Sequence, residues 1–292
     1  MCSFLWCFPI AGVITIAVAM SHGLVYWLLG VATWLWELLP QGCWPISCIQ
    51  VPDDMKLFWQ ALLSAEITVG SFLKLPSNVY LLGLKRWGGA LLVRHCYRDL
   101  FDQMMDLHSS GTKRRFCITG TPGIGKSFFA VVLMGWLVKE KKVRTIVFDT
   151  AGSRYLFTFY GMNVIVKEGN QNDFRDKLNN SATWWIIDMG PARDVCEAST
   201  VLLASHNLDQ YLTLLNLRVA TALHMPLWTD DEIEKCRSQL FPTLDAAMVQ
   251  TLMLKWGNIP RYVLEKATDE QAQRSLDAAI NACQWKDMLK GI

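Results

Sequence analysis

The pattern of apolar and charged residues changes along the chain. Residues 1–36 carry no charged side chain, and the first charge is Glu37. Beyond residue 115, short apolar runs alternate with segments whose apolar residues recur at helical spacing, which is typical of a mostly parallel sheet covered by helices. Beyond Pro226 only helical spacing remains. We therefore expect an α/β core followed by an all-helical C-terminal part.

Individual elements follow from the same pattern. The expected strands are 116–119, 145–149, 154–160, 164–166, 184–188, 200–205 and 219–225. Helical spacing predicts helices over 91–105, 126–139, 229–240, 244–256 and 259–267, and a further one that carries Leu276, Ile280 and Cys283. An earlier helix is expected to begin at Asp53 or Asp54.

The apolar leader, residues 1–40, is long enough to cross a bilayer, since one helix needs ~20 apolar residues. Phe4 to Ile16 can instead be the hydrophobic part of a signal peptide with a small-residue cleavage site at 17–19, although no Lys or Arg precedes it. A hairpin of two short helices and an artefact of gene prediction are further interpretations. The leader bears on location, with membrane anchoring as one alternative, and indicates no chemistry.

Composition excludes several classes of site. The formal net charge of +2 is too small to predict a nucleic-acid surface. Nine cysteines occur without CxxC pairs or Cys/His clusters, which predicts neither a zinc site nor a disulfide framework. Four tryptophans fall on apolar strands or helix faces and are expected in the core rather than as stacking platforms: Trp184, Trp185, Trp228 and Trp256.

The clearest motif is GxxxxGK[ST], which lies between an expected strand and an expected helix. It comprises Gly120, Thr121, Pro122, Gly123, Ile124, Gly125, Lys126 and Ser127. The glycines let backbone amides converge on phosphates, and the helix N-terminus adds a favourable partial charge. Lys126 is expected to reach the β- and γ-phosphates and Ser127 to ligate Mg²⁺. The motif predicts binding of a nucleoside triphosphate, with ATP as the expected nucleotide.

Asp188 ends the strand 184–188 and is the candidate to hold Mg²⁺ through water, although it can instead cap the following turn. Many hydrolytic P-loop enzymes of the AAA+ kind place a glutamate directly after this aspartate. Met189 and Gly190 stand there in this chain, and Asp194 or Glu197 is a speculative substitute. We therefore expect hydrolysis that is slow or assisted by a partner.

Two further positions are candidates for contact with the triphosphate. Ser205, His206 and Asn207 follow the strand 200–205, and Asn207 or Ser205 is the preferred polar contact to the γ-phosphate. A turn that caps the next helix is the equally weighted alternative. Arg261 begins an expected helix of the C-terminal part and can couple the triphosphate charge to the position of that part, or it can be an ordinary surface arginine.

In this order the motifs resemble the P-loop module of Crinkler-type effectors of oomycetes and some fungi, and also that of kinetoplastid retrotransposon hot spot proteins. The resemblance covers residues 70–267, and its more specific pieces are Met-Pro-x-Trp at 225–228 and Gly-x-Ile-Pro-Arg-Tyr at 257–262. Other matching stretches are Phe72-Leu73-Lys74-Leu75-Pro76, the helix at 93–100, residues 117–119 before the glycine loop, and 184–188.

The resemblance implies a secreted or translocated protein that acts in another organism's cell, often its nucleus, where nucleotide binding regulates an attached effector. The pattern along the chain predicts a leader at 1–40, a region before the NTPase at 41–110, a P-loop NTPase core at 111–226 and a helical lid at 227–292. The chain has an apolar leader in place of a polar header and ends soon after residue 267, so we expect a truncated copy or regulatory remnant without a nuclease-like domain.

Three hypotheses remain from the sequence. The first is a Crinkler-like NTPase that binds ATP and Mg²⁺, hydrolyses ATP slowly and has a lid that responds to nucleotide. The second is a switch or scaffold that binds nucleotide without hydrolysis and holds a host or self protein partner. The third is an NTPase anchored to a membrane through residues 1–36.

Overall fold

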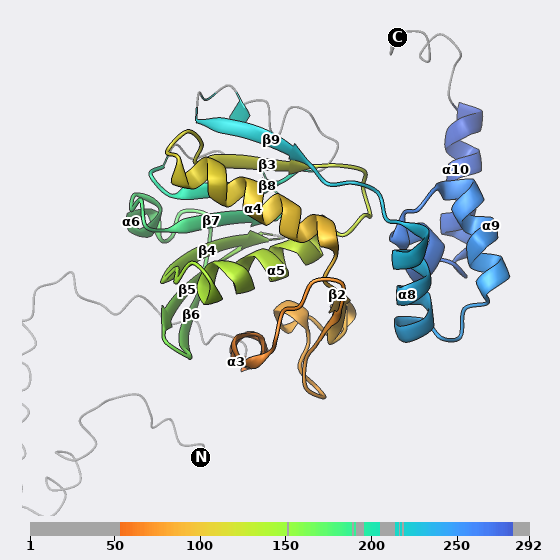
Figure 1. Cartoon of the computed structure of the whole chain (residues 1–292), viewed down its shortest axis with the longest axis horizontal. Coiled ribbons are helices and arrows are strands. Elements are labelled where there is room, and N and C mark those ends of the chain that lie inside the picture. The colour runs from red at the N-terminus through yellow and green to blue at the C-terminus, as the bar shows by residue number, and fades with distance from the viewer. Residues whose placement is uncertain are drawn as a thin grey trace, which may run out of the picture. The chain divides into compact units, whose positions relative to one another are not determined.

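The computed structural model of the chain describes residues 53–150, 152–188, 190, 196–204, 214, 215, 217 and 219–282 (Figure 1). The leader and its alternative interpretations lie outside these residues. Within them, no helix is both long enough and apolar enough to cross a membrane.

A seven-stranded mixed sheet forms the centre of the described part (Figure 1). Its strands run in the order β6-β5-β4-β7-β8-β3-β9. In chain order they are β3 (Arg115–Thr119), β4 (Thr145–Thr150), β5 (Ser153–Tyr160), β6 (Asn163–Gly169), β7 (Trp184–Asp188), β8 (Ser199–Leu203) and β9 (Ala220–His224). Within the sheet, adjacent strands of the run β4-β7-β8-β3-β9 are parallel. Strands β5 and β6 extend the sheet beyond β4 through antiparallel pairing. The prediction of a mostly parallel sheet flanked by helices is confirmed.

Alternate residues of the central strands enter two separate apolar clusters, one on each face of the sheet. Phe116 and Ile118 of β3 belong to the first cluster, while Cys117 between them belongs to the second. Successive side chains of a strand point to opposite faces, so a strand buried on both faces needs a continuous apolar run. This requirement explains why the strands could be recognised in the sequence. The Cys117 thiol is accordingly buried in the second cluster.

Helices α3 (Asp53–Ser64), α4 (His95–Ser109) and α5 (Lys126–Lys139) pack on the first face. Every residue of α5 from Phe129 to Val138 is buried, because the sheet lies on one side of this helix and α3 and α4 on the other. The short helix α6 (Arg175–Leu178) contributes Leu178 to the cluster on the second face. Helix α5, which follows the glycine loop, is thus packed at the centre of the first layer.

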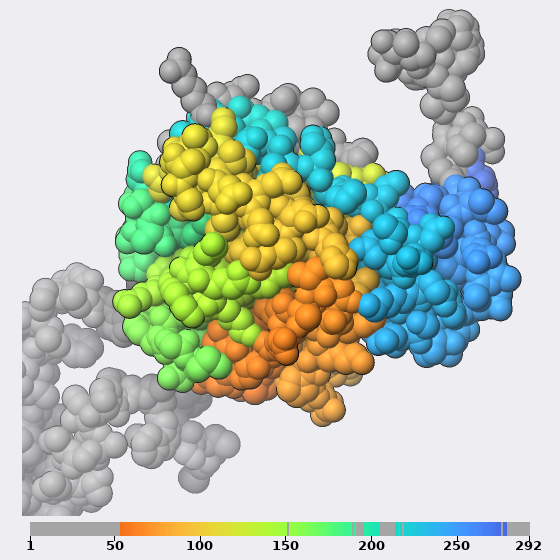
Figure 2. Space-filling view, viewed as in Figure 1, coloured from red at the N-terminus to blue at the C-terminus, as the bar shows by residue number. Residues whose placement is uncertain are grey.

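The C-terminal part consists of α8 (Asp230–Leu240), α9 (Ala246–Trp256), a π-helical turn η3 (Arg261–Glu265) and α10 (Glu270–Ala282). Ile233, Val249 and Val263 share an apolar cluster with Leu92 from the region before the core. In Figure 2 the blue atoms of this part meet the yellow and orange atoms around the start of α4. Its four elements are helical, as expected, and its role as a lid stays a prediction.

One predicted helix begins later than expected. The helix predicted over 91–105 starts at His95, because Ala90–Leu92 form strand β2, which pairs antiparallel with β1 (Phe72–Lys74). Leu91 packs into the first cluster and Leu92 into the C-terminal one, on opposite sides of the strand. Two adjacent buried leucines fit helical spacing in the sequence equally well. Two 3-10 turns, η1 (Leu81–Gly83) and η2 (Lys85–Trp87), connect β1 to β2.

Candidate nucleotide-binding site

The glycine loop connects β3 to α5 at the carboxyl end of the parallel strands. Gly125 precedes the first helical residue with a φ of 97°, and a Cβ there would lie 2.9 Å from the Tyr97 hydroxyl. Backbone conformation and close approach therefore both require glycine at this position. The strand, loop and helix occur in the order that the motif needs, so the amides at the start of α5 are available to an anion.

The Lys126 ammonium folds back onto its own loop. Its Nζ donates to the carbonyl oxygens of Gly120 at 2.7 Å and of Thr121 at 3.0 Å. Burial lowers the pKa of Lys126, the positive charge of Arg261 lowers it further, and the negative charge of Asp188 opposes both effects. A phosphate group near Lys126 would offer this desolvated cation a stronger, charged acceptor than the two carbonyls.

Ser127 and Asp188 meet directly beneath the loop. The Ser127 hydroxyl donates to Asp188 Oδ1 at 2.9 Å. Asp188 is 3% exposed, and its second oxygen, Oδ2, has no hydrogen-bond partner among the described residues. Burial raises the pKa of Asp188, while the Ser127 hydrogen bond and the Lys126 charge lower it. A buried carboxylate oxygen without a donor is costly unless it meets a cation or water.

This donor set fits Mg²⁺. The ion takes oxygen ligands and is usually held by one or two protein groups together with phosphate oxygens and water. Ser127 Oγ and Asp188 Oδ2, which lacks a partner in the part of the chain that the structure describes, supply such a pair. Within the described ranges no group of three or more His, Cys, Asp or Glu side chains forms an all-protein metal cage. The site therefore has the composition expected for Mg²⁺ that is bound together with a phosphate group.

Strand β8 lies between the strand that precedes the loop and the strand that ends in Asp188. Leu203 of β8 is level with Ile118 on one side and with Asp188 on the other. The chain thus leaves β8, at Ala204, between the glycine loop and the carboxylate. Ser205, His206 and the predicted contact Asn207 follow immediately but lie outside the described residues.

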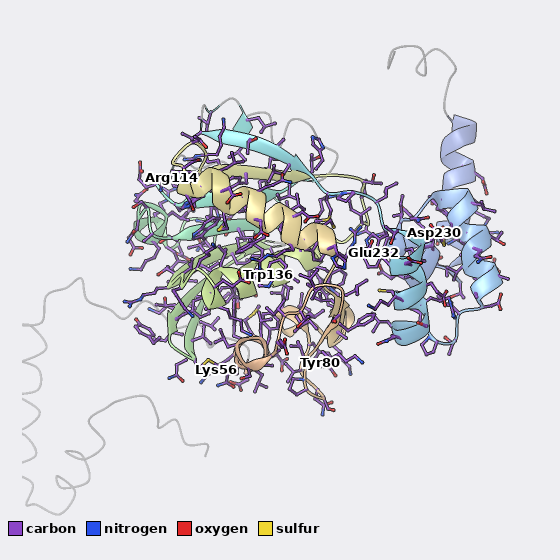
Figure 3. The ribbon with its side chains drawn as sticks, in the orientation of Figure 1. Lys56, Tyr80, Arg114, Trp136, Asp230 and Glu232 are labelled. Carbon is purple, nitrogen blue, oxygen red and sulfur yellow. The ribbon has the colours of Figure 1, made fainter. Side chains whose placement is uncertain are left out.

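Glu197, considered above as a substitute for the missing glutamate, lies before the first residue of β8. It pairs with Arg114 at 3.7 Å, and Figure 3 shows Arg114 at the end of the sheet away from Glu232 and α8. The full length of β8 separates Glu197 from Asp188, roughly 17 Å for five extended residues. Glu197 is therefore wrongly placed to activate water at the loop, while Asp194 and Met189 lie outside the described residues.

Arg261 lies against the glycine loop rather than on a remote surface. A Cβ added to Gly123 would be 2.8 Å from Arg261 Cβ and 3.1 Å from a methyl of Ile259. The side chain of Arg261 is exposed, so its guanidinium remains accessible to a ligand. The start of η3 thus brings a cation to the same loop that carries Lys126.

Three side chains that sequence reasoning did not place at the site contact the loop or its supports. Trp228 Nε1 donates to the Ile124 carbonyl at 2.8 Å, and the Tyr97 hydroxyl donates to the Gly125 carbonyl at 3.1 Å. Arg94, buried at 2% exposure, lies beside both aromatic rings. Trp184 and Trp185 are buried as expected, whereas Trp228 and Trp256 are half-buried.

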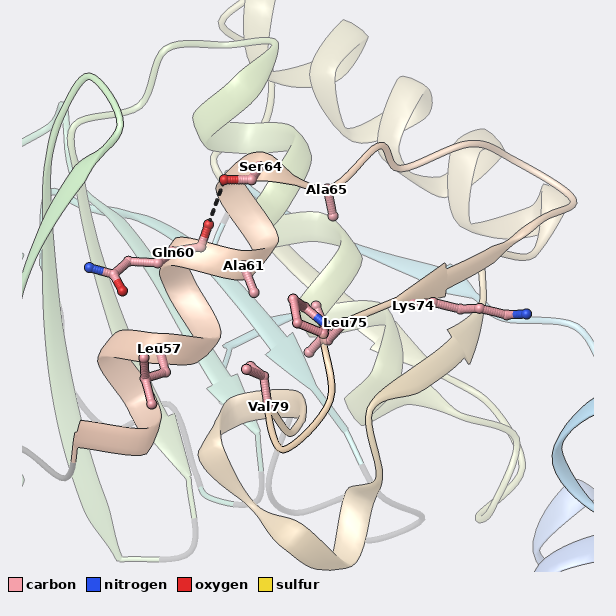
Figure 4. Close-up of a pocket in the computed structure, with 9 residues that line it drawn as sticks. Leu57, Gln60, Ala61, Ser64, Ala65, Lys74, Leu75 and Val79 are labelled. Carbon is pink, nitrogen blue, oxygen red and sulfur yellow. Dashed lines mark hydrogen bonds between the residues drawn. The ribbon is translucent and has the colours of Figure 1, made fainter.

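A separate hollow of about 580 Å³ lies between α3 and the segment after β1 (Figure 4). Its lining is mainly apolar and includes Leu57, Ala61, Leu75 and Val79, with Lys74 as its charged residue. No residue of the glycine loop lines it, and neither Asp188 nor Arg261 does. We therefore do not assign the chemistry of the glycine loop to this hollow.

Comparison with known proteins gives one family match and two similar curated proteins. Residues 105–219 match the family described as "Helicase HerA, central domain". Crinkler effector proteins 15 and 16 of Phytophthora infestans are each 28% identical over 206 residues, which is 68% of this chain and 32% of each relative. The chain thus spans about a third of the length of the curated relatives that it matches.

The family match runs from α4 to the residue before β9 and includes the glycine loop and Asp188. A chain of the solved wild-type Clp1p-Pcf11p complex aligns with 51% of this chain and 45% of its own length, at 12% identity and a TM-score of 0.28. A likeness at that TM-score supports no conclusion about this protein. The relation to kinetoplastid proteins stays a prediction.

Proposed function

We propose that this protein binds a nucleoside triphosphate, with ATP as the expected nucleotide, together with Mg²⁺, and hydrolyses it slowly. The observation that carries the proposal is the buried Asp188 oxygen beside Ser127, at the base of the glycine loop, which has no hydrogen-bond partner among the described residues. The match of residues 105–219 to the HerA central domain and the similarity to Crinkler effectors support it.

Each residue of the site has a role in this proposal. The amides of residues 123–127 hold the phosphates at the N-terminus of α5. Lys126 exchanges its two carbonyl acceptors for phosphate oxygens, while Ser127 and Asp188 would hold Mg²⁺. A bound Mg²⁺ neutralises charge on the phosphate oxygens. Asn207 is proposed as a polar contact to the terminal phosphate from the end of β8.

Residues 227–292 are proposed as a lid on the core at 111–226. Arg261 supports this proposal, because the aliphatic part of its side chain packs against Gly123 and its charge lowers the pKa of Lys126. Two neighbouring cations repel each other in the free site, and a triphosphate between them would convert that repulsion into attraction. Nucleotide binding would then favour the position of η3 close to the loop.

A second candidate function is a nucleotide-bound switch or scaffold without turnover, which holds a protein partner. Met189 in place of a glutamate and the remote position of Glu197 favour it. Turnover measured with the purified protein separates the candidates: an ATPase rate that depends on Asp188 favours the enzyme, and binding without turnover favours the switch.

The relatives are named effectors, and this chain shares with them a region that is a third of their length. We propose that this region supplies the nucleotide-dependent part of a secreted, host-directed protein. Residues 1–40 fused to a reporter test the delivery step. Reporter recovered in the culture medium would support secretion, reporter in the membrane pellet would support an anchor, and reporter confined to the cytosol would refute both.

Equilibrium binding of ATP with and without Mg²⁺ tests the site itself. The wild-type protein and Asp188→Asn are compared at equal concentrations of folded protein. The proposal expects Mg²⁺ to strengthen ATP binding in the wild type and to have little effect in the variant. An identical response to Mg²⁺ in both proteins would remove Asp188 from the site.

A further inference from the structure

The direction of a backbone amide is tied to the carbonyl that precedes it. In a trans peptide unit the C=O of one residue and the N–H of the next lie in one plane and point in opposite directions. A side chain that holds a carbonyl on one side of a loop therefore directs the following N–H to the other side. In a phosphate-binding loop, the amides at the helix N-terminus are the groups that must point at the ligand.

Two carbonyls of the glycine loop are held in this way from outside the loop. The Trp228 indole donates to the Ile124 carbonyl at 2.8 Å, which fixes the direction of the Gly125 amide. The Tyr97 hydroxyl donates to the Gly125 carbonyl at 3.1 Å, which fixes the direction of the Lys126 amide. The second carbonyl also accepts the helical bond from Phe129, so Tyr97 reinforces the first turn of α5.

A buried arginine organises both donors. The Arg94 guanidinium lies 4.8 Å from the Trp228 ring and 5.8 Å from the Tyr97 ring. Its nitrogens donate to both carboxylate oxygens of Glu232, at 2.9 and 3.1 Å, and to the Pro226 and Leu227 carbonyls at 3.3 and 2.8 Å. These bonds hold the segment that carries Trp228 against the N-terminal end of α4, where Tyr97 is located.

Glu232 makes a second contact, which fixes the position of its own side chain. It completes a capping box at the start of α8, where its carboxylate accepts from the Thr229 amide at 3.0 Å. The first turn of α8 and the start of α4 are therefore joined by one charged group, labelled in Figure 3. The arrangement spans 138 positions of sequence between Arg94 and Glu232.

We propose that Trp228 and Tyr97 are positioning residues, which orient the phosphate-binding amides of Gly125 and Lys126 and are themselves held by Arg94 and Glu232. This inference rests on the proposed nucleotide binding, since oriented amides affect function when a phosphate meets them. The same bonds join α8 and residues 226–229 before it to the loop. Displacing α8 would release the Ile124 carbonyl and disorder the phosphate site.

The test uses substitutions that remove a single donor from the full-length protein. Tyr97→Phe deletes one hydroxyl, and Trp228→Phe deletes the indole N–H while keeping an aromatic ring beside Arg94. Two matched controls remove equivalent donors elsewhere. Tyr155→Phe removes the hydroxyl that donates to Glu168, and Trp256→Phe removes the indole N–H that donates to Gln273. Thermal unfolding is recorded for all four variants, so that a general loss of stability is measured separately.

Calorimetric titration with Mg²⁺-ATP is the first readout. We expect each of the two loop variants to bind about three- to tenfold more weakly than the wild type, the loss typical of one intramolecular hydrogen bond. The controls should bind as the wild type does, even where their unfolding temperature falls. Loop variants that bind like the wild type would overturn the proposal, whatever their unfolding temperature.

The second readout does not depend on nucleotide. Full-length protein with ¹⁵N-labelled glycine and lysine gives NMR order parameters for the Gly125 and Lys126 amides in the free state. We expect values typical of a rigid backbone, about 0.85, in the wild type and controls, falling toward about 0.6 in the loop variants. Unchanged values in the variants would overturn the proposal.

The two readouts also separate this inference from the function on which it rests. If the wild type binds no Mg²⁺-ATP, the proposed nucleotide binding fails. Lower order parameters in the loop variants would then still support the orientation of the amides, and unchanged ones would refute it. If the wild type binds and the variants lose neither affinity nor order, the nucleotide site stands and the positioning role fails.

Discussion

Ser127 and Asp188, 61 positions apart in the sequence, meet where α5 begins and β7 ends, and the serine hydroxyl donates a 2.9 Å hydrogen bond to Asp188 Oδ1. The other carboxylate oxygen is buried and unpartnered among the described residues. Such an atom is costly in a protein without ligand. A cation bound beside Asp188 would relieve this penalty.

The first prediction concerns that penalty. Asp188→Asn should raise the free energy of unfolding of the nucleotide-free protein at neutral pH, because a neutral amide replaces a desolvated carboxylate. The same substitution should weaken Mg²⁺-dependent ATP binding by about 10- to 100-fold, as expected for a group that positions the metal. Urea unfolding and calorimetry measure the two effects. A variant that loses stability as well as binding would mean that Asp188 mainly supports the fold.

The pH dependence of stability provides a second prediction. The folded-state pKa of Asp188 lies above its ordinary value of 3.8, so the folded protein binds more protons than the unfolded chain between these two values. The wild type therefore loses stability, relative to Asp188→Asn, as pH rises through that interval. The unfolding free energies of both proteins, measured below about pH 5 and again up to about pH 8, test the sign of this pH dependence. A difference between the proteins that is independent of pH would contradict the raised pKa.

A third prediction concerns the buried ion pair of Arg94 and Glu232, whose side chains are 1% and 16% exposed. Glu232→Gln leaves a buried guanidinium without its counter-charge, and we expect a loss of about 3 kcal/mol in unfolding free energy. Glu234→Gln on the same helix is the matched control. Glu234 pairs with Arg237 while 57% exposed, so solvent screens the pair and Glu234→Gln should cost much less stability than Glu232→Gln. Equal losses from both substitutions would contradict a special role for Glu232.

The fourth prediction concerns the effect of Arg261 on nucleotide affinity. Arg261→Ala should reduce ATP affinity by about tenfold, the effect of removing one charged hydrogen bond, and should change AMP affinity little. Arg274→Ala is the control, since Arg274 is an exposed arginine of α10 that pairs with Glu270. An equal loss for ATP and AMP would indicate a general structural effect, and no loss for either would leave Arg261 as a surface residue.

The extent to which the fold was predictable differs between its parts. The expected strand 184–188 and helix 126–139 have the bounds of β7 and α5, because 184–187 and 128–138 carry no charged side chain and are bounded by polar residues. Leu91 and Leu92 were assigned to a helix, because two adjacent leucines fit either periodicity, and strand pairing with β1 decides between them. Local pattern therefore predicts buried elements well and short paired strands poorly.

The site divides in a similar way. The glycine loop and Asp188 form local patterns in the sequence, and the structure brings Ser127 and Asp188 together. The contact of Trp228 with Ile124 spans 104 positions, and no spacing rule links them. The same holds for Arg94, which looks like an ordinary helix-start arginine in sequence but is buried by the C-terminal part. Asn207 lies outside the described residues, so its role stays a prediction.

The most direct test of the central claim is binding and turnover of Mg²⁺-ATP by the wild type and Lys126→Ala. Lys139→Ala is the matched control, because Lys139 is a half-buried lysine of the same helix that also donates to a backbone carbonyl. The account predicts that Lys126→Ala abolishes measurable binding and any slow turnover, while Lys139→Ala retains both. Unchanged ATP binding by Lys126→Ala would contradict the assignment of the nucleotide site to this loop.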